Sequence, residues 1–259
     1  MGTATNDQCM PYNGFASNPL TSSNVCVLVG HSIEAITSAV VLASLGQRVH
    51  LYADIDLLAQ QIQQYSFEHH LQALWQMYVQ QRVITSQALP DSAETLIQYY
   101  ETANHGDSHV VSQSIHSDDQ NKVALYWLFL DSIKSAWTED GWIRAFNQSH
   151  QQALPVIMSG IKELGAVSAL SERLQRAWVY YIPFVFLQDG DAYNSMLNPA
   201  LWLLGEKTAD SNQHLEMLQP LMQHARAAHH ADIATIEFAR SSIMAMLATR
   251  VSFMNEMSR

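Results

Sequence analysis

Two short patterns near the start of the chain could bind a nucleotide that carries phosphate. Residues 30–35 read GHSIEA after a short apolar run, and Asp54 lies further along the chain. A glycine turn that opens a helix offers backbone N–H groups and a positive dipole end to a phosphate. An acidic side chain after the following strand can accept hydrogen bonds from a ribose. The candidate cofactor-binding residues are Gly30, His31, Ser32, Ile33, Ala35 and Asp54.

The glycine pattern departs from the usual dinucleotide fingerprint G-x-G-x-x-G/A. Gly30 keeps the tight turn, and Ala35 is an accepted third position. Ser32 places a side chain where the backbone should approach the phosphates, and Glu34 adds a negative charge in the first helical turn. Two interpretations therefore stay open: a dinucleotide site that takes NAD, or a unit that keeps the fold and has lost its ligand.

The elements around this turn read as strand, helix and strand. Val25–Val29 is apolar and rich in β-branched residues, as in a buried parallel strand. Ile33 to Leu45 carries apolar residues at helical spacing, and Gly46 stands where a C-cap glycine belongs. Val49–Tyr52 is a second strand. This is the first βαβ unit of an α/β, Rossmann-like fold, with a doubly wound and mostly parallel sheet.

The remaining chain continues this alternation. Further strands are predicted at Val123–Leu130, Pro155–Met158, Ala177–Leu187 and Leu201–Leu204. Helices are predicted at Leu57–Val83 with a break at 66–68, after Pro90, and at Trp142–Gln152, Ile161–Arg176, Leu215–Arg226 and Asp232–Arg259. Asp131 and Ser132 follow the Val123–Leu130 strand, at the ligand edge of such a sheet. We expect a flexible leader (1–24), a Rossmann-like domain (25–231) and a C-terminal helix (232–259).

The composition bears on the partners and the location of the protein. The 259 residues are 48% hydrophobic and carry a formal net charge of −11, which argues against nucleic acid or an anionic membrane as partner. Cys9 and Cys26 imply no disulfide framework. No basic leader or apolar run of about 20 residues is present, so we expect a cytoplasmic protein without a membrane span.

Histidine-rich positions do not read as metal sites. His69 and His70 are adjacent and would face different sides of a helix. His224, His229 and His230 lack the i, i+4 pairing of helical zinc motifs. We predict solvated surface positions and no metal.

Three stretches together resemble the UDP-glucose/GDP-mannose dehydrogenase family. Residues 25–56 end in YADID, similar to the family's V-D-I-D. Residues 186–192, FLQDGDA, with Leu197-Asn198-Pro199 resemble its N-P-E-F-L-x-E-G-x-A and downstream L-N-P. Residues 237–256, EFARSSIMAMLATRVSFMNE, resemble the start of its central helix and are the most specific match. A weaker similarity is Phe67-Glu68, near the family's Y-E-P-G-L.

The resemblance implies NAD-dependent oxidation of a nucleotide sugar through a cysteine thioester. This sequence lacks the side chains for that chemistry. Arg240 replaces the family's lysine, Met244 its asparagine and Val185 its base glutamate, and Asp189 shortens its second acid. The family's cysteine segment and its sugar-binding domain lie beyond Arg259.

Three functions remain open on these grounds. The first is a catalytically silent protein of this kind that binds a dinucleotide or a protein partner. The second is an oxidoreductase completed by a second polypeptide, and the third is an interaction module without a ligand. Because the family's central helix mediates dimerisation, and apolar residues continue to Met254, we also expect a homodimer through residues 232–259.

Overall fold

The structure is a computed structural model. It describes residues 24–105, 122–133, 137–149, 154–160, 163–185, 190–207 and 212–258. The leader, the polar stretch after His105 and the candidate position Asp189 lie outside these ranges.

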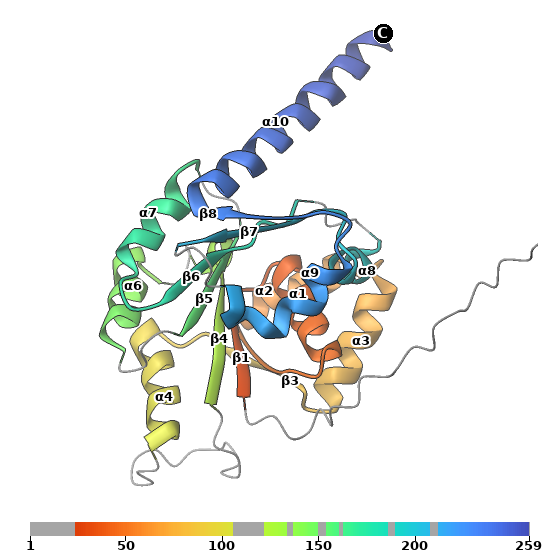
Figure 1. Cartoon of the computed structure of the whole chain (residues 1–259). Coiled ribbons are helices and arrows are strands. Elements are labelled where there is room, and N and C mark those ends of the chain that lie inside the picture. The colour runs from red at the N-terminus through yellow and green to blue at the C-terminus, as the bar shows by residue number, and fades with distance from the viewer. Residues whose placement is uncertain are drawn as a thin grey trace, which may run out of the picture.

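Within those ranges the strands form one sheet of eight, in the order β3-β2-β1-β4-β5-β6-β7-β8. Only the β6–β7 pair is antiparallel. The strands are β1 (Asn24–Val29), β2 (Arg48–Ala53), β3 (Ile84–Ala88), β4 (Lys122–Phe129), β5 (Pro155–Ser159), β6 (Trp178–Tyr181), β7 (Trp202–Glu206) and β8 (Ala228–Asp232). The predicted doubly wound, mostly parallel sheet is therefore confirmed (Figure 1).

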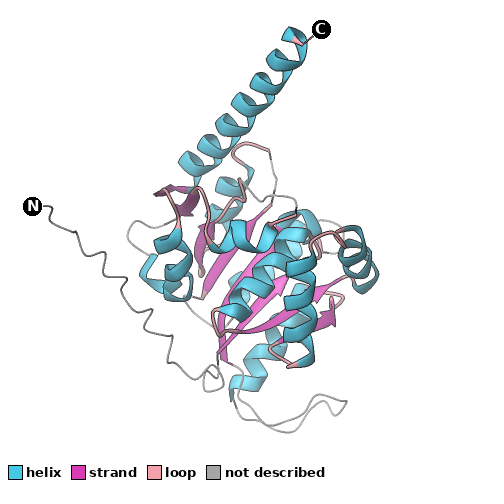
Figure 2. Ribbon diagram, turned by 90° about the vertical axis from the view of Figure 1, so that its right-hand side faces the viewer, coloured by secondary structure: helices cyan, strands magenta, loops and turns pink. Residues whose placement is uncertain are grey.

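Helices cover both faces of the sheet (Figure 2). They are α1 (Ile33–Ser44), α2 (Ile55–Gln64), α3 (His69–Gln80), α4 (Ala93–His105), α5 (Leu130–Ile133), α6 (Glu139–Gln148), α7 (Ala166–Arg173), α8 (Ala192–Leu197), α9 (Gln219–His224) and α10 (Ile233–Met257), with a 3₁₀ segment η1 (Asn212–Leu218). Helices α1, α3, α8 and α9 contribute to the core on one face, and α4, α6 and α7 to the core on the other.

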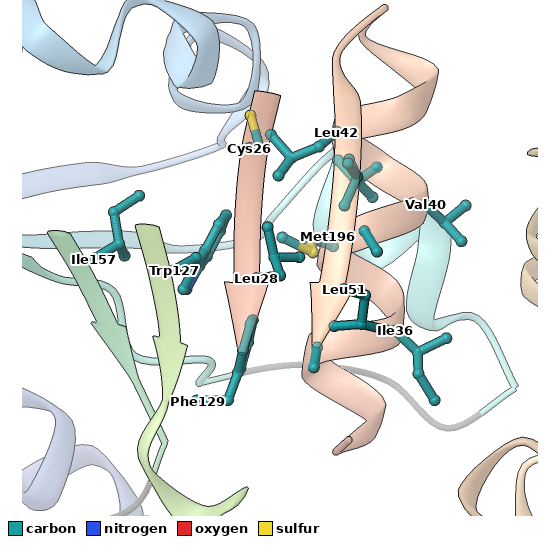
Figure 3. Close-up of a cluster of buried hydrophobic side chains, with 14 of the residues drawn as sticks. Cys26, Leu28, Ile36, Val40, Leu42, Leu51, Trp127, Phe129, Ile157 and Met196 are labelled. Carbon is teal, nitrogen blue, oxygen red and sulfur yellow. The ribbon is translucent and has the colours of Figure 1, made fainter. Parts of the chain in front are cut away.

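Strand β1 explains why helices must cover both faces of the sheet. Successive side chains of a strand point to opposite faces. Cys26 and Leu28 belong to one core, whereas Val25, Val27 and Val29 belong to the other. All five side chains are buried, so both faces of this central strand need a helical layer. Figure 3 shows the first of these cores, where Leu28 lies near side chains of α1 and β4.

Two predicted elements are shorter than expected. The apolar run 177–187 gives only β6, which ends before Pro183. Proline has no N–H for a sheet ladder, so the strand cannot continue through it. The helix predicted from Ile161 begins at Ala166, after Gly165 in a left-handed conformation with φ of 85°.

Besides the four-residue helix α5, three further elements were not predicted. Strand β3 has an alternating, half-polar sequence, ITSQA, because only part of it is buried. Strand β8, AHHAD, is mostly exposed and includes His229 and His230, so it lacks an apolar signal. Helix α8 is six residues long and follows Asp191, where the sequence reads as a turn.

Helix α10 leaves the domain after its first turns (Figures 1 and 2). The Asp232 side chain caps its start by accepting a hydrogen bond from the Thr235 amide at 2.9 Å. Ile233 and Ile236 are buried, whereas residues from Met244 onward are exposed. None of the described helices is both long and apolar enough to cross a membrane.

Two buried glutamates tie distant parts of the chain together. Glu68, just before α3, accepts hydrogen bonds from the Gly190 amide and, at 3.1 Å, from the Ala192 amide at the start of α8. Glu237 of α10 accepts from the Val167 and Ser168 amides at 2.9 and 3.0 Å. Each carboxylate therefore neutralises the positive end of another helix, which supplies the partners that a buried charge needs.

We predict that Glu68→Ala lowers the free energy of unfolding by about 2–4 kcal/mol, because two amides at α8 lose a charged acceptor inside the protein. The exposed neighbour provides a matched control: His69→Ala should change stability by less than about 0.5 kcal/mol. Urea unfolding followed by circular dichroism measures both. Equal stability of the two variants would show that Glu68 has no such role.

Candidate functional site

The candidate site lies where the chain connections of the sheet reverse direction. From β1 the chain moves outward to β2 and β3 and then returns to β4, on the other side of β1. The carboxyl ends of β1 and β4 therefore diverge into helices on different faces, which is where open α/β sheets bind ligands. A cavity of about 140 Å³ lies at this edge and is lined by Gly30, His31, Tyr52, Asp54 and Ser132, among others.

Gly30 makes the tight turn that ends β1. Its amide donates to the Tyr52 carbonyl at 2.9 Å, and its φ is 150°. A Cβ atom at this position would lie 2.7 Å from the Phe129 Cβ. No side chain fits there unless β4 moves, so glycine is required both by the backbone conformation and by the close approach of the two strands.

The start of α1 supplies the N–H groups of the candidate phosphate site. Ser32 is the N-cap residue, and its hydroxyl accepts a hydrogen bond from the Ala35 amide at 3.4 Å. The His31 amide donates to the Ser132 hydroxyl oxygen at 3.1 Å. The amides of Ser32 and Ile33 have no acceptor within the helix because they belong to its first turn.

Ser132 is a site residue whose role the sequence did not reveal. The sequence places Asp131 and Ser132 at the ligand edge but does not predict a contact with the glycine turn. In the structure β4 runs directly into α5, which buries Ser132 against His31. The Ser132 hydroxyl thus accepts the hydrogen bond of the His31 amide, which the turn could otherwise offer to a phosphate.

Asp54 lies at the end of β2 and caps α2. Its Oδ1 atom accepts from the Asp56 and Leu57 amides, both at 3.1 Å. Neither of these two bonds involves Oδ2, the other oxygen of the exposed carboxylate. Asp54 also lines a second, wider cavity of about 400 Å³ toward Pro90 and Asp91. The carboxylate therefore stands between the glycine turn and an open space next to β3.

His31 lies half-buried beside this carboxylate. Burial lowers the pKa of His31 below its ordinary value, and the charge of Asp54 acts in the opposite direction. A lowered pKa favours the neutral imidazole, which adds no positive charge to the candidate phosphate site.

The positions that resemble catalytic ones do not form a comparable site among the described residues. Val185 is half-buried and packs against the core that includes α4, α6 and α7. Arg240 is half-buried on α10, and its charge opposes the rise in the pKa of Tyr181, which burial brings to about 12. Met244 is 40% exposed. Near Val185 the structure leaves a cavity of only about 30 Å³, the volume of a single water molecule.

Cys26, the cysteine that the structure describes, is structural. It is buried in β1, and its Sγ lies 3.5 Å from the Met217 Sδ. Burial raises the pKa of the thiol to about 12. Since the thiolate is the reactive form, this side chain is not a nucleophile at neutral pH. Among the described residues, no group of three or more His, Cys, Asp or Glu side chains could hold a metal ion.

No protein-family model matches the sequence, and no curated protein matches it. Solved structures do match. A UDP-glucose dehydrogenase from Pyrobaculum islandicum is 16% identical with a TM-score of 0.61, covering 94% of this chain and 54% of that one. A GDP-mannose dehydrogenase from Pseudomonas aeruginosa is 15% identical with a TM-score of 0.58, covering 89% and 51%.

A third match is the NDP-N-acetyl-D-galactosaminuronic acid dehydrogenase from Methanosarcina mazei. It is 10% identical with a TM-score of 0.61, covering 90% of this chain and 49% of that chain. The resemblance inferred from three short stretches is therefore confirmed at the level of the fold. The chain has the fold of nucleotide-sugar dehydrogenases and spans about half the length of those it matches.

Proposed function

We propose that this protein binds a dinucleotide, NAD, at the carboxyl edge of β1, β2 and β4, and that alone it does not oxidise a nucleotide sugar. The observation that carries the proposal is the cavity of about 140 Å³, which brings together the Gly30 turn and Asp54. The fold it shares with dehydrogenases supports the dinucleotide site.

The residues present fit the adenosine ribose and the central pyrophosphate of such a ligand differently. Asp54 suits the adenosine ribose, because a carboxylate oxygen outside the helix cap can accept its hydroxyl groups. The Ser32 and Ile33 amides suit a pyrophosphate. Ser132 takes the His31 amide, and Glu34 adds a negative charge close by, so phosphate binding is weaker than in an intact glycine fingerprint. Bound NAD supplies a hydride acceptor, the nicotinamide ring.

The catalytic silence follows from the side chains at the family's positions. A guanidinium does not exchange protons in proteins as a lysine amine can, so arginine at position 240 is a poor substitute for the family's lysine. Met244 has neither the donor nor the acceptor of an asparagine. Val185 cannot act as a base, and the thiol of Cys26 is buried and protonated.

A specific observation also favours each of two other functions. The chain spans about half of the dehydrogenases it matches, so a second polypeptide that supplies a cysteine and a sugar-binding domain would complete an oxidoreductase. Alternatively, the apolar residues exposed along α10 suit a protein partner, and the module then works without any ligand. We place the protein in the cytoplasm, since its few cysteines suggest no oxidising compartment.

We predict that the pure protein does not reduce NAD in the presence of UDP-glucose or GDP-mannose. The reason is the loss of the proton-transferring and nucleophilic side chains named above. Absorbance at the NADH band, followed over hours with a working dehydrogenase as the positive control, is the measurement. Steady NADH formation by the pure protein would refute catalytic silence.

We predict that NAD binds more tightly than NADP, because Asp54 repels a 2′-phosphate. Asp54→Asn should keep the cap of α2 through its remaining oxygen and weaken NAD binding about tenfold. The nearby Asp56→Asn removes the same charge and should leave NAD affinity within about twofold. Isothermal titration calorimetry measures all three proteins. Tighter binding of NADP by the native protein contradicts the prediction.

We also propose a homodimer formed through α10. Met246, Val251 and Met254 are 73%, 60% and 60% exposed. A helix that carries such residues away from the domain needs a partner surface, and a two-fold dimer of the same helix is the commonest closed arrangement.

We predict that light scattering at micromolar concentration gives twice the monomer mass. Val251→Asp combined with Met254→Asp should give the monomer, because the charges would be buried in the interface. Ser252→Asp with Asn255→Asp adds the same charge at polar positions and should disrupt the dimer less. A native protein that is monomeric at this concentration refutes the proposal.

A further inference from the structure

Another cavity, separate from the one beside Gly30, borders the start of α1 and has the Ile33 side chain in its wall. It has a volume of about 200 Å³ and lies between α1, α2 and α3. Its walls include Ile33, Ile36, Ile62, Leu71, Gln72 and Trp75. In Figure 3 the Ile36 side chain projects from α1 on the side away from β1 and β4.

Helix α2 is the least buried of the three helices around the cavity. Of the α2 side chains only Leu58 is buried, whereas Ile55 and Leu57 are 44% and 37% exposed. Ile62 of α2 and Tyr65 at its C-terminal end line the cavity together with Trp75 of α3.

The walls of this cavity are held in place by polar contacts. The Gln72 side chain donates a hydrogen bond from Nε2 to the Ile62 carbonyl at 2.8 Å, which joins α3 to α2. Glu68, one residue before α3, is fixed by the Gly190 and Ala192 amides. The opening between the helices is therefore preformed, as ligand pockets usually are.

The chemistry of the lining defines what can bind. None of the lining side chains carries a charge, so an ion would lose its hydration without gaining a counter-charge. Trp75 and the isoleucines offer apolar contact, and Tyr65 and Gln76 provide polar groups among the remaining lining residues. An apolar cavity of about 150 Å³ is known to bind benzene, so this one suits a ligand of roughly 6–10 non-hydrogen atoms.

We infer that this cavity is a binding site for a small neutral ring, aromatic or alicyclic, with at most one polar substituent. The site adjoins the candidate phosphate site through Ile33, but it does not rest on the function proposed above. A helix from a second copy of the chain is too wide for a cavity of about 200 Å³, which favours a free small molecule as occupant.

Indole and toluene are suitable probes, with benzoate as a charged counterpart of toluene. We expect indole and toluene to bind saturably, with dissociation constants on the order of 0.1–1 mM for ligands of this size. In a protein labelled at isoleucine δ1 methyl groups, NMR signals of Ile33, Ile36 and Ile62 should shift on titration, because they line the cavity. The signals of Ile84 and Ile157, which are buried elsewhere, should stay in place.

A variant with a larger side chain in the cavity should bind both probes less tightly. Ile62→Trp places a large side chain in the opening and should weaken binding of both probes at least tenfold. Gln63→Trp adds the same bulk at an exposed position of the same helix and should leave affinity within about twofold. Circular dichroism checks that both variants are folded, and the methyl shifts of the native protein test the site even if one variant is not.

Several results would overturn the inference. They are the absence of saturable shifts with indole and toluene, shifts confined to Ile84 or Ile157, and binding of benzoate as strong as that of toluene. Unchanged affinity in folded Ile62→Trp would place the ligand elsewhere. Dissociation of a dimer by toluene, seen by sedimentation, would instead make a side chain of a second copy the occupant.

Discussion

The contact between the ends of β1 and β4 is the constraint on which the rest of the site depends. Gly30 passes so close to Phe129 that a Cβ atom would clash. This approach sets the distance between the glycine turn and α5 and brings the Ser132 hydroxyl to the His31 amide. Because the helices leave the two strands on opposite faces, the crevice beside Gly30 is a consequence of how the sheet is wound.

The stretches that resemble the dehydrogenases contain residues that hold this structure together. Glu237 opens the most specific of these stretches, and its carboxylate accepts hydrogen bonds from two amides at the start of α7. Glu68 belongs to the weakest similarity, yet it joins the start of α3 to Gly190 and Ala192. By contrast, the same resemblance implies a lysine and an asparagine at the positions that Arg240 and Met244 occupy. The two glutamates thus give the similarity a structural basis, since each holds the start of another helix in place.

Sequence reasoning succeeded where burial is strong and local. Residues 25–29 are apolar throughout because both faces of β1 are buried, and the following helix and strand have equally clear periodicity. The reasoning missed β8, because this exposed edge strand carries no apolar alternation. It also could not find the Ser132 contact, which joins residues 101 positions apart in the sequence. The cavity between α1, α2 and α3 likewise combines residues of three helices, which sequence periodicity does not place relative to one another.

The most direct test of the account is a backbone amide NMR titration of the native protein with NAD. Binding in the crevice should shift the amide signals of Ser32 and Ile33, together with that of Asp54, in a saturable manner. Signals from the exposed half of α10 should not follow the same titration curve. If NAD leaves the amides of residues 30–33 unchanged, or shifts only distant residues, the crevice is not a dinucleotide site and the central claim fails.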